Sequence, residues 1–138
     1  MLTPYNQYRN VHVTTSNPEK ILIMLYDGAI NFTRIALDKL AKGDVAGKGL
    51  YISKTHAIVA ELMSTLNHEI GGDVARQLQR LYTYLIDELV AANINNSPER
   101  LENVLRILTH LRETWAEAIK IAKTEREADS ARLIANIA

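Results

Sequence analysis

Histidines and carboxylates are the residues of this chain that could hold a metal ion or transfer a proton. Four histidines, His12, His56, His68 and His110, are spread over the N-terminal segment and three later parts of the chain. Di-metal carboxylate proteins built on helical bundles place a histidine three residues after a glutamate on two helices. No glutamate of this sequence has a histidine at that spacing. The sequence therefore predicts no enzyme, no metal site and no cofactor.

Other residues that could belong to a site have structural interpretations. Gly71 and Gly72 follow no strand pattern, so we interpret them as turn glycines rather than as a phosphate-binding loop. Asp27 interrupts an apolar stretch. It is either an exposed or capping carboxylate, or a group that binds backbone amides of a partner. Trp115 lies on an apolar stripe and is interpreted as a packing residue.

Composition narrows the class of protein. The chain has 138 residues, enough for one domain with a proper core. Lysine plus arginine and aspartate plus glutamate number 16 each, and no basic stripe with interleaved aromatics suggests nucleic acid as a partner. There are no cysteines, the N-terminus lacks a signal-peptide pattern, and no apolar run is long enough to insert in a membrane. We expect a cytoplasmic protein.

Capping signals and apolar periodicity predict four long helices. A capping side chain followed by proline and glutamate occurs twice, as NPE at 17–19 and SPE at 97–99, and marks two helix starts. No segment alternates with a period of two, so no strands are expected. Short connections require each helix to lie antiparallel to the next, which predicts an all-α, up-down-up-down four-helix bundle. The expected helices cover about 18–41, 45 or 50 to 68, the Gly71–Gly72 pair to a polar loop at 93–96, and 98–123.

Three regions follow from this pattern. Residues 1–16 form a leader that is expected to dock as an N-terminal lid, and residues 17–123 form the bundle domain. Residues 124–138 keep helical composition. They are expected to form either a short C-terminal helix or an extension of the fourth helix.

The first helix is more apolar than packing against its neighbours in a bundle requires, so one flank needs additional cover. Residues 21–26, ILIMLY, contain no polar break. Around the helix, the apolar surface spans roughly 200°, compared with the 100° or so typical of a core-facing stripe. The leader, the tail or a second copy of the chain could cover the surplus. The alternative is a partner segment held in a groove.

Four motifs in order resemble one family. They are SNPEKILIMLYDGAINF at 16–32, LxxLYxYL at 78–85, AAN at 91–93 and LRETWAEAI at 111–119. With their spacing, they make the chain similar to the FliS family of bacterial flagellin export chaperones, over about residues 5–122. The resemblance implies an antiparallel four-helix bundle. It also implies a partner, the C-terminal segment of flagellin, which is disordered when free and wraps around the bundle, and delivery of this cargo to the membrane export gate.

The resemblance leads to a set of expected contact residues. The leader would act as a lid over the flagellin-binding surface, and the first and third helices would provide that surface. A homodimer that buries the apolar flank is the alternative. The expected partner-binding residues are Tyr5 and Tyr8 of the leader, Ile21, Leu22, Leu25, Tyr26, Ala29 and Ile30 of the first helix, and Tyr82 and Leu85 of the third.

Overall fold

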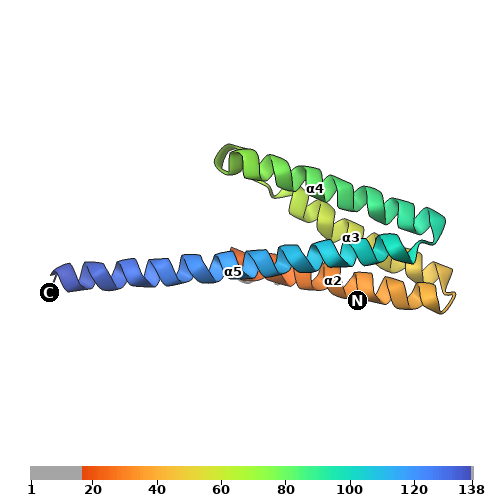
Figure 1. Cartoon of the computed structure of the whole chain (residues 1–138), viewed down its shortest axis with the longest axis horizontal. Coiled ribbons are helices and arrows are strands. Elements are labelled where there is room, and N and C mark those ends of the chain that lie inside the picture. Colours follow the sequence, from red (N-terminus) through yellow and green to blue (C-terminus); the bar gives the residue numbers. More distant parts are fainter. Residues whose placement is uncertain (1–16, 138) are drawn as a thin grey trace.

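The computed structural model describes residues 17–137, and it confirms the predicted four-helix bundle. Each helix lies antiparallel to the next along the chain (Figure 1). Helix α2 packs against α3 and α5, and α4 packs against the same two helices. The predicted lid falls in residues 1–16, outside the described residues. The helices are α2 (Pro18–Ala41), α3 (Val45–Ser64), α4 (His68–Asn95) and α5 (Pro98–Ile137).

The predicted start of α2 has the expected capping geometry. Asn17 adopts an extended backbone, and its Oδ1 accepts a hydrogen bond from the backbone N–H of Lys20 at 3.1 Å. Pro18 occupies the first helical position, where its missing N–H costs nothing. The helix ends before Gly43, whose φ of +75° is a conformation that favours glycine. Local sequence thus sets both ends of the helix.

Helix α2 buries a wide face because it has two packed neighbours. Its core residues include Tyr26, Ala29 and Ala36, all with no exposed surface. A helix held between α3 and α5 needs an apolar surface directed at each of them, so a stripe wider than that for a single neighbour is consistent with ordinary core packing. The same core contains Leu85 and Leu89 of α4 and, from α5, Leu101, Val104 and Leu108.

Two boundaries differ from the sequence-based expectation. Helix α3 ends at Ser64 and α4 begins at His68, so the glycine pair lies inside α4 rather than between helices. Asn67 caps this earlier start by accepting a hydrogen bond from the backbone N–H of Ile70. The sequence-based prediction started the helix at the glycines and did not include this cap. The tail agrees with one of its two expected alternatives, since helix α5 continues without a break to Ile137 and the tail extends it.

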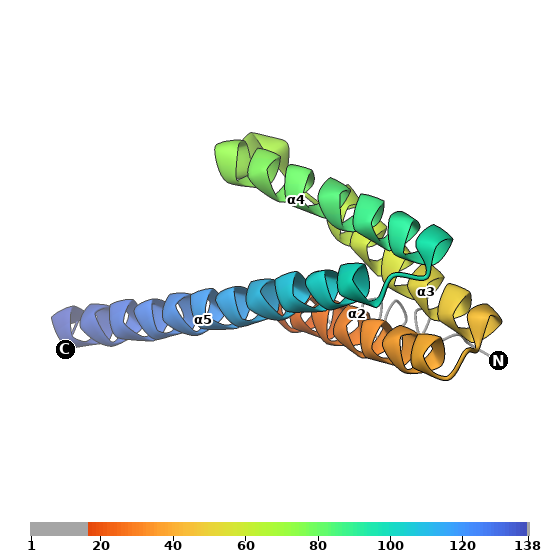
Figure 2. The same ribbon diagram turned by 45° about the vertical axis from the view of Figure 1, so that its right-hand side comes forward.

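The bundle has a closed end and an open end. At the closed end, the buried Lys48 of α3 donates hydrogen bonds to the carbonyl of Asn93 at 2.9 Å and to Oδ1 of Asn96 at 2.5 Å. Arg100 of α5 pairs with Glu88 of α4 at 2.6 Å at the same end. Toward the other end, the α3–α4 pair separates from the α2–α5 pair (Figure 2).

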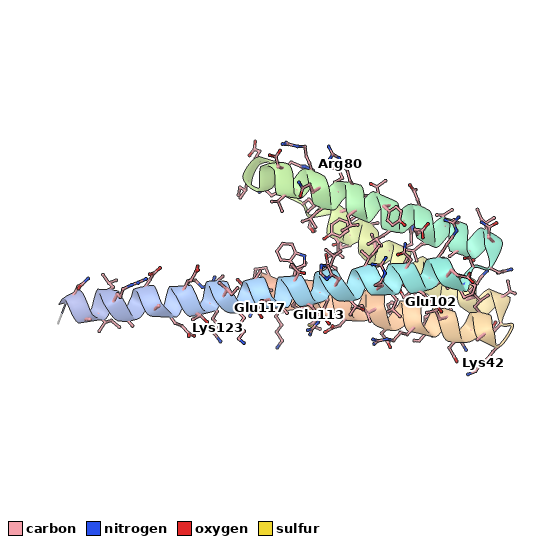
Figure 3. The ribbon with its side chains drawn as sticks, viewed as in Figure 1. Lys42, Arg80, Glu102, Glu113, Glu117 and Lys123 are labelled. Atoms are coloured by element: carbon pink, nitrogen blue, oxygen red, sulfur yellow. The ribbon has the colours of Figure 1, made fainter. Side chains whose placement is uncertain are left out.

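Many of the side chains on the outer faces are charged. Among those labelled in Figure 3, Arg80 of α4 and Glu113, Glu117 and Lys123 of α5 are all exposed. Across residues 17–137, we find no helix with the length and apolarity needed to cross a bilayer.

Candidate functional site

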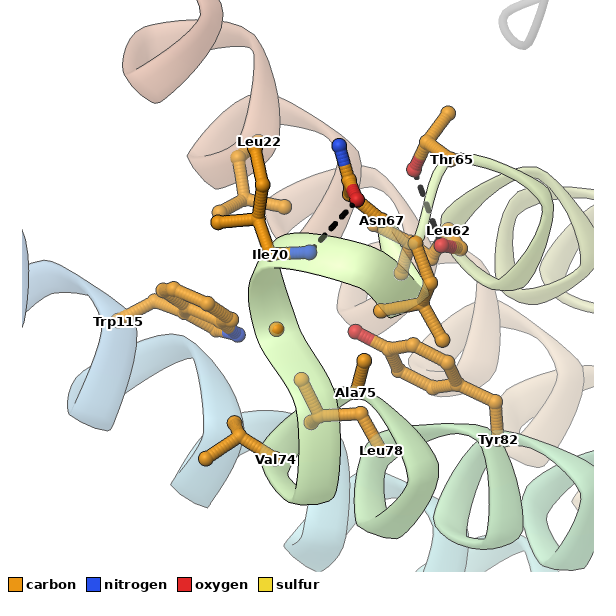
Figure 4. Close-up of a pocket in the computed structure, with 12 residues that line it drawn as sticks. Leu22, Leu62, Thr65, Asn67, Ile70, Val74, Ala75, Leu78, Tyr82 and Trp115 are labelled. Atoms are coloured by element: carbon orange, nitrogen blue, oxygen red, sulfur yellow. Dashed lines mark hydrogen bonds between the residues drawn. The ribbon is translucent and has the colours of Figure 1, made fainter.

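An apolar cleft of about 290 Å³ lies at the open end of the bundle. Leu22 of α2 and Trp115 of α5 lie on one side of it, and the turn between α3 and α4 lies on the other (Figure 4). Every helix within residues 17–137 therefore contributes to the cleft. Its lining residues are Leu22, Leu62, Thr65, Leu66, Asn67, Ile70, Gly71, Val74, Ala75, Leu78, Tyr82 and Trp115.

Two of the apolar side chains that line the cleft are exposed to solvent. Ile70 is 86% exposed and Val74 is 61% exposed. Both lie on the first part of α4, where that helix has separated from α5. Exposed apolar side chains beside an apolar cleft are typical of a surface that a partner covers.

A break in α4 shapes this side of the cleft. Gly72 has φ +49° and ψ −122°, which is not helical and is a conformation essentially restricted to glycine. A Cβ at this position would meet no atom within 4 Å, so backbone conformation rather than lack of space requires the glycine. The first turn of α4 thereby takes its own direction.

Two tyrosines meet beneath the cleft. Tyr26 of α2 and Tyr82 of α4 have no more than 2% exposed surface, and their hydroxyl oxygens are 2.6 Å apart. Burial raises the pKa of Tyr26, with a further contribution from the neighbouring Tyr82, and burial also raises the pKa of Tyr82. Helices α2 and α4 are not packed neighbours, so this pair connects them across the bundle. Tyr82 also lines the cleft, which places a polar group at its base.

Asp27 is on the outer surface rather than in the cleft. Its carboxylate accepts a hydrogen bond from Nε of Arg112 at 2.9 Å, and the two side chains are 51% and 36% exposed. Glu19 and Arg126 form a second ion pair between α2 and α5 at 3.4 Å. Asp27 is thus an exposed carboxylate that links two helices.

The expected contact residues fall into three groups. Leu22 and Tyr82 line the cleft. Six others are at most 8% exposed, because they form the faces that α2 and α4 direct into the core, so contact through them would require the bundle to open. Tyr5 and Tyr8 lie outside the described residues. The six core residues are Ile21, Leu25, Tyr26, Ala29, Ile30 and Leu85.

Sequence reasoning identified Tyr82 on the α4 side of the cleft but missed Ile70 and Val74. These two residues lie on either side of the glycine pair, which the sequence pattern indicates as a turn between helices. Trp115 was expected to pack in the core, and it does pack against core residues while also lining the cleft. The sequence signal for this part of the cleft was a pair of apolar residues beside two glycines near the start of a helix.

The cleft is suited to binding apolar side chains rather than to catalysis. Its lining is mainly leucine, isoleucine, valine, alanine and aromatic groups, and Asn67, Thr65 and Tyr82 are the polar members. Within residues 17–137, histidine and carboxylate side chains form no group of three that could bind a metal ion. An apolar surface with a few polar groups is typical of recognition sites for ligands and peptides.

Comparisons with known proteins identify the family. The family model "Flagellar protein FliS" matches residues 1–122. The flagellar secretion chaperone FliS of Campylobacter jejuni is 34% identical over 113 residues, which cover 82% of this chain and 88% of that protein. The Bacillus subtilis protein of the same name is 32% identical over 123 residues, covering 89% of this chain and 91% of its own.

A solved structure agrees with the fold. The crystal structure of a flagellar chaperone from bacteria matches with a TM-score of 0.71 over 84% of this chain and 94% of the other, at 22% sequence identity. At that identity the likeness supports the bundle alone, and the family match carries the function. This chain belongs to the FliS family and is a flagellar secretion chaperone, not an enzyme.

Proposed function

We propose that this chaperone binds the C-terminal segment of flagellin in the cytoplasm, and that the cleft at the open end forms part of the binding surface. The observation that carries the proposal is the apolar cleft with Ile70 and Val74 exposed beside it. The names of the relatives, which are flagellar secretion chaperones, support a flagellar export client.

The energetics favour a client with a few apolar contacts. Each leucine, isoleucine or phenylalanine buried in such a cleft contributes about 1.5 to 3 kcal/mol. Ordering a disordered segment costs about 2 to 5 kcal/mol or more. Several apolar side chains of flagellin, some in the cleft and others along neighbouring helices, are enough for stable binding.

The leader is proposed to protect the apolar surface before flagellin arrives. Residues 1–16 carry Tyr5 and Tyr8, and the chain enters α2 only one turn before Leu22 of the cleft. A lid that occupies the cleft for part of the time lowers the apparent affinity by the fraction of time it is closed. It also shields apolar surface that would otherwise favour aggregation.

Binding of this segment has two consequences for export. Flagellin subunits assemble through their terminal segments, so an occupied terminus prevents polymerisation before export. The bound segment also stays unfolded for passage through the export channel. Delivery to the export gate completes the proposed role.

Calorimetry with a peptide of about forty residues from the flagellin C-terminus tests the proposal. We expect one-site binding with a negative heat-capacity change, since apolar surface is buried. No binding at micromolar concentrations, with the chaperone folded by circular dichroism, would refute it.

Two isoleucines on α4 provide a matched pair of variants. Ile70 lines the cleft, whereas Ile94 lies at the far end of the same helix and is 74% exposed. We expect Ile70→Ser to weaken binding by roughly 10-fold or more, because an apolar contact worth about 1.5 kcal/mol or more is lost. Ile94→Ser should bind as the parent does. Equal effects would show that the cleft is not the contact surface.

The oligomeric state tests the alternative, a homodimer that covers the same surface. Light scattering over a concentration series should show a monomer. A dimer that Ile70→Ser dissociates would instead assign the open end to self-association.

A further inference from the structure

One wall of the cleft is a distinct unit of structure. The segment from Thr65 to Gly71, called the flap below, supplies five of the twelve lining residues (Figure 4). It begins where α3 ends and contains the first turn of α4. Asn67 caps that turn, since its Oδ1 accepts a hydrogen bond from the backbone N–H of Ile70 at 3.0 Å. The flap therefore has its own cap, separate from the main part of α4.

Gly72 joins the flap to the main part of α4. Its φ of +49° with ψ of −122° interrupts the helix between Gly71 and Asp73. For glycine, this conformation and the helical and extended ones differ little in energy, because glycine has no Cβ. Hinges are typically a few residues at the ends of helices that absorb such changes in φ and ψ.

The flap is attached to α3 at its start, where the N–H and Oγ1 of Thr65 donate hydrogen bonds to the carbonyls of Glu61 and Leu62, and its side chains from 67 to 70 are exposed. Leu66 is the partly buried member that packs against the core. Ile70 is 86% exposed, so displacing it sacrifices almost no buried surface in the free protein. Gly43, in the connection between α2 and α3, has a positive φ like Gly72. Unlike the flap, Gly43 is exposed at a place that does not line the cleft.

We propose that the flap pivots at Gly72 and that its closure brings Ile70 against an apolar side chain of the client held between Leu22 and Trp115. The identity of the client rests on the proposed function, whereas the hinge can be observed without a client. The closed flap would cover a bound side chain on the side that is open in the free protein. Ile70 is then a specificity-determining contact, and Gly72 is a positioning residue.

The composition of the chain permits a direct measurement of flap movement. There is no cysteine and only one tryptophan, Trp115. Bimane attached to Ile70→Cys will label the flap at one site, and Trp115 quenches bimane on contact. Fluorescence decay of the free protein should show a quenched and an unquenched component. The Trp115→Phe substitution should remove the quenched component. That result would assign the quenched component to contact between bimane and the Trp115 side chain.

A glycine variant and a matched control test the hinge. At φ +49° and ψ −122°, alanine is disfavoured by at least about 1 to 2 kcal/mol, so Gly72→Ala should change the ratio of the two components by at least about 5-fold. Gly43→Ala also places an alanine at a positive φ, +75°, with no atom within 4 Å of the new Cβ, and should leave the ratio unchanged. A single decay component in the labelled parent would overturn the hinge, as would equal effects of the two alanine variants.

Adding the flagellin peptide separates this inference from the proposed function. If calorimetry detects binding, saturating peptide should convert the two decay components into one, and persistence of both would overturn the role of the flap. If calorimetry detects no binding, the proposed function fails, and the decay of the free protein and of Gly72→Ala still decides whether the flap pivots.

Discussion

The paired hydroxyls of Tyr26 and Tyr82 give the most quantitative prediction about the bundle. Their oxygens are 2.6 Å apart, and both rings are almost fully buried. Replacing either tyrosine with phenylalanine removes one hydroxyl and leaves the other without its partner. Replacing both removes the polar pair as a whole.

The expected magnitudes follow from what each hydroxyl can reach. A buried polar group that loses its hydrogen-bond partner costs about 1 to 3 kcal/mol, whereas removing both partners is close to neutral. Both tyrosines are at most 2% exposed, so water does not readily replace the lost partner of either hydroxyl. We therefore expect Tyr82→Phe and Tyr26→Phe each to cost about 1 to 3 kcal/mol.

Urea unfolding at neutral pH, followed by circular dichroism, measures all four members of this double-mutant cycle. The double variant should be more stable than the sum of the single changes predicts, by about 1 to 3 kcal/mol of coupling. Unchanged m-values would show that the comparison is between the same folded and unfolded states. Strictly additive changes, or a double variant less stable than either single one, would refute the hydrogen-bonded pair.

Three further predictions concern pH and two polar contacts. Because burial raises the pKa of Tyr26 and Tyr82, the unfolded chain loses these protons first as the pH rises above about 10. The free energy of unfolding should then fall by up to about 1.4 kcal/mol per pH unit for each phenol. Urea unfolding at several pH values should show that this fall with pH is smaller in the double phenylalanine variant. Lys48→Met should lower the free energy of unfolding by about 2 to 4 kcal/mol, because two hydrogen bonds from a buried ammonium are lost; unchanged urea stability would contradict the closed-end network. Asp27→Asn should change stability by less than about 1 kcal/mol in a thermal melt, since its pair with Arg112 is half-exposed, and a larger loss would show that this pair does more than join two surfaces.

Much of the site depends on geometry that the apolar pattern does not contain. The pattern of α2 indicates that Leu22, Leu25 and Tyr26 are apolar, but the three differ in role. Leu22 lines the cleft, whereas the other two are buried. The difference arises because the two pairs of helices separate near the start of α2, so residues one turn apart meet different surroundings.

The sequence by itself determined the helices and their order. Apolar periodicity, the NPE and SPE caps and short connections depend on interactions between residues close in the chain, and these are enough to specify an antiparallel bundle. The motifs also indicated the family. Only the tertiary structure decided where the bundle opens. That depends on how α4 departs from α5 and on the backbone of Gly72, which brings Ile70, Leu22 and Trp115 from distant parts of the chain around one cleft.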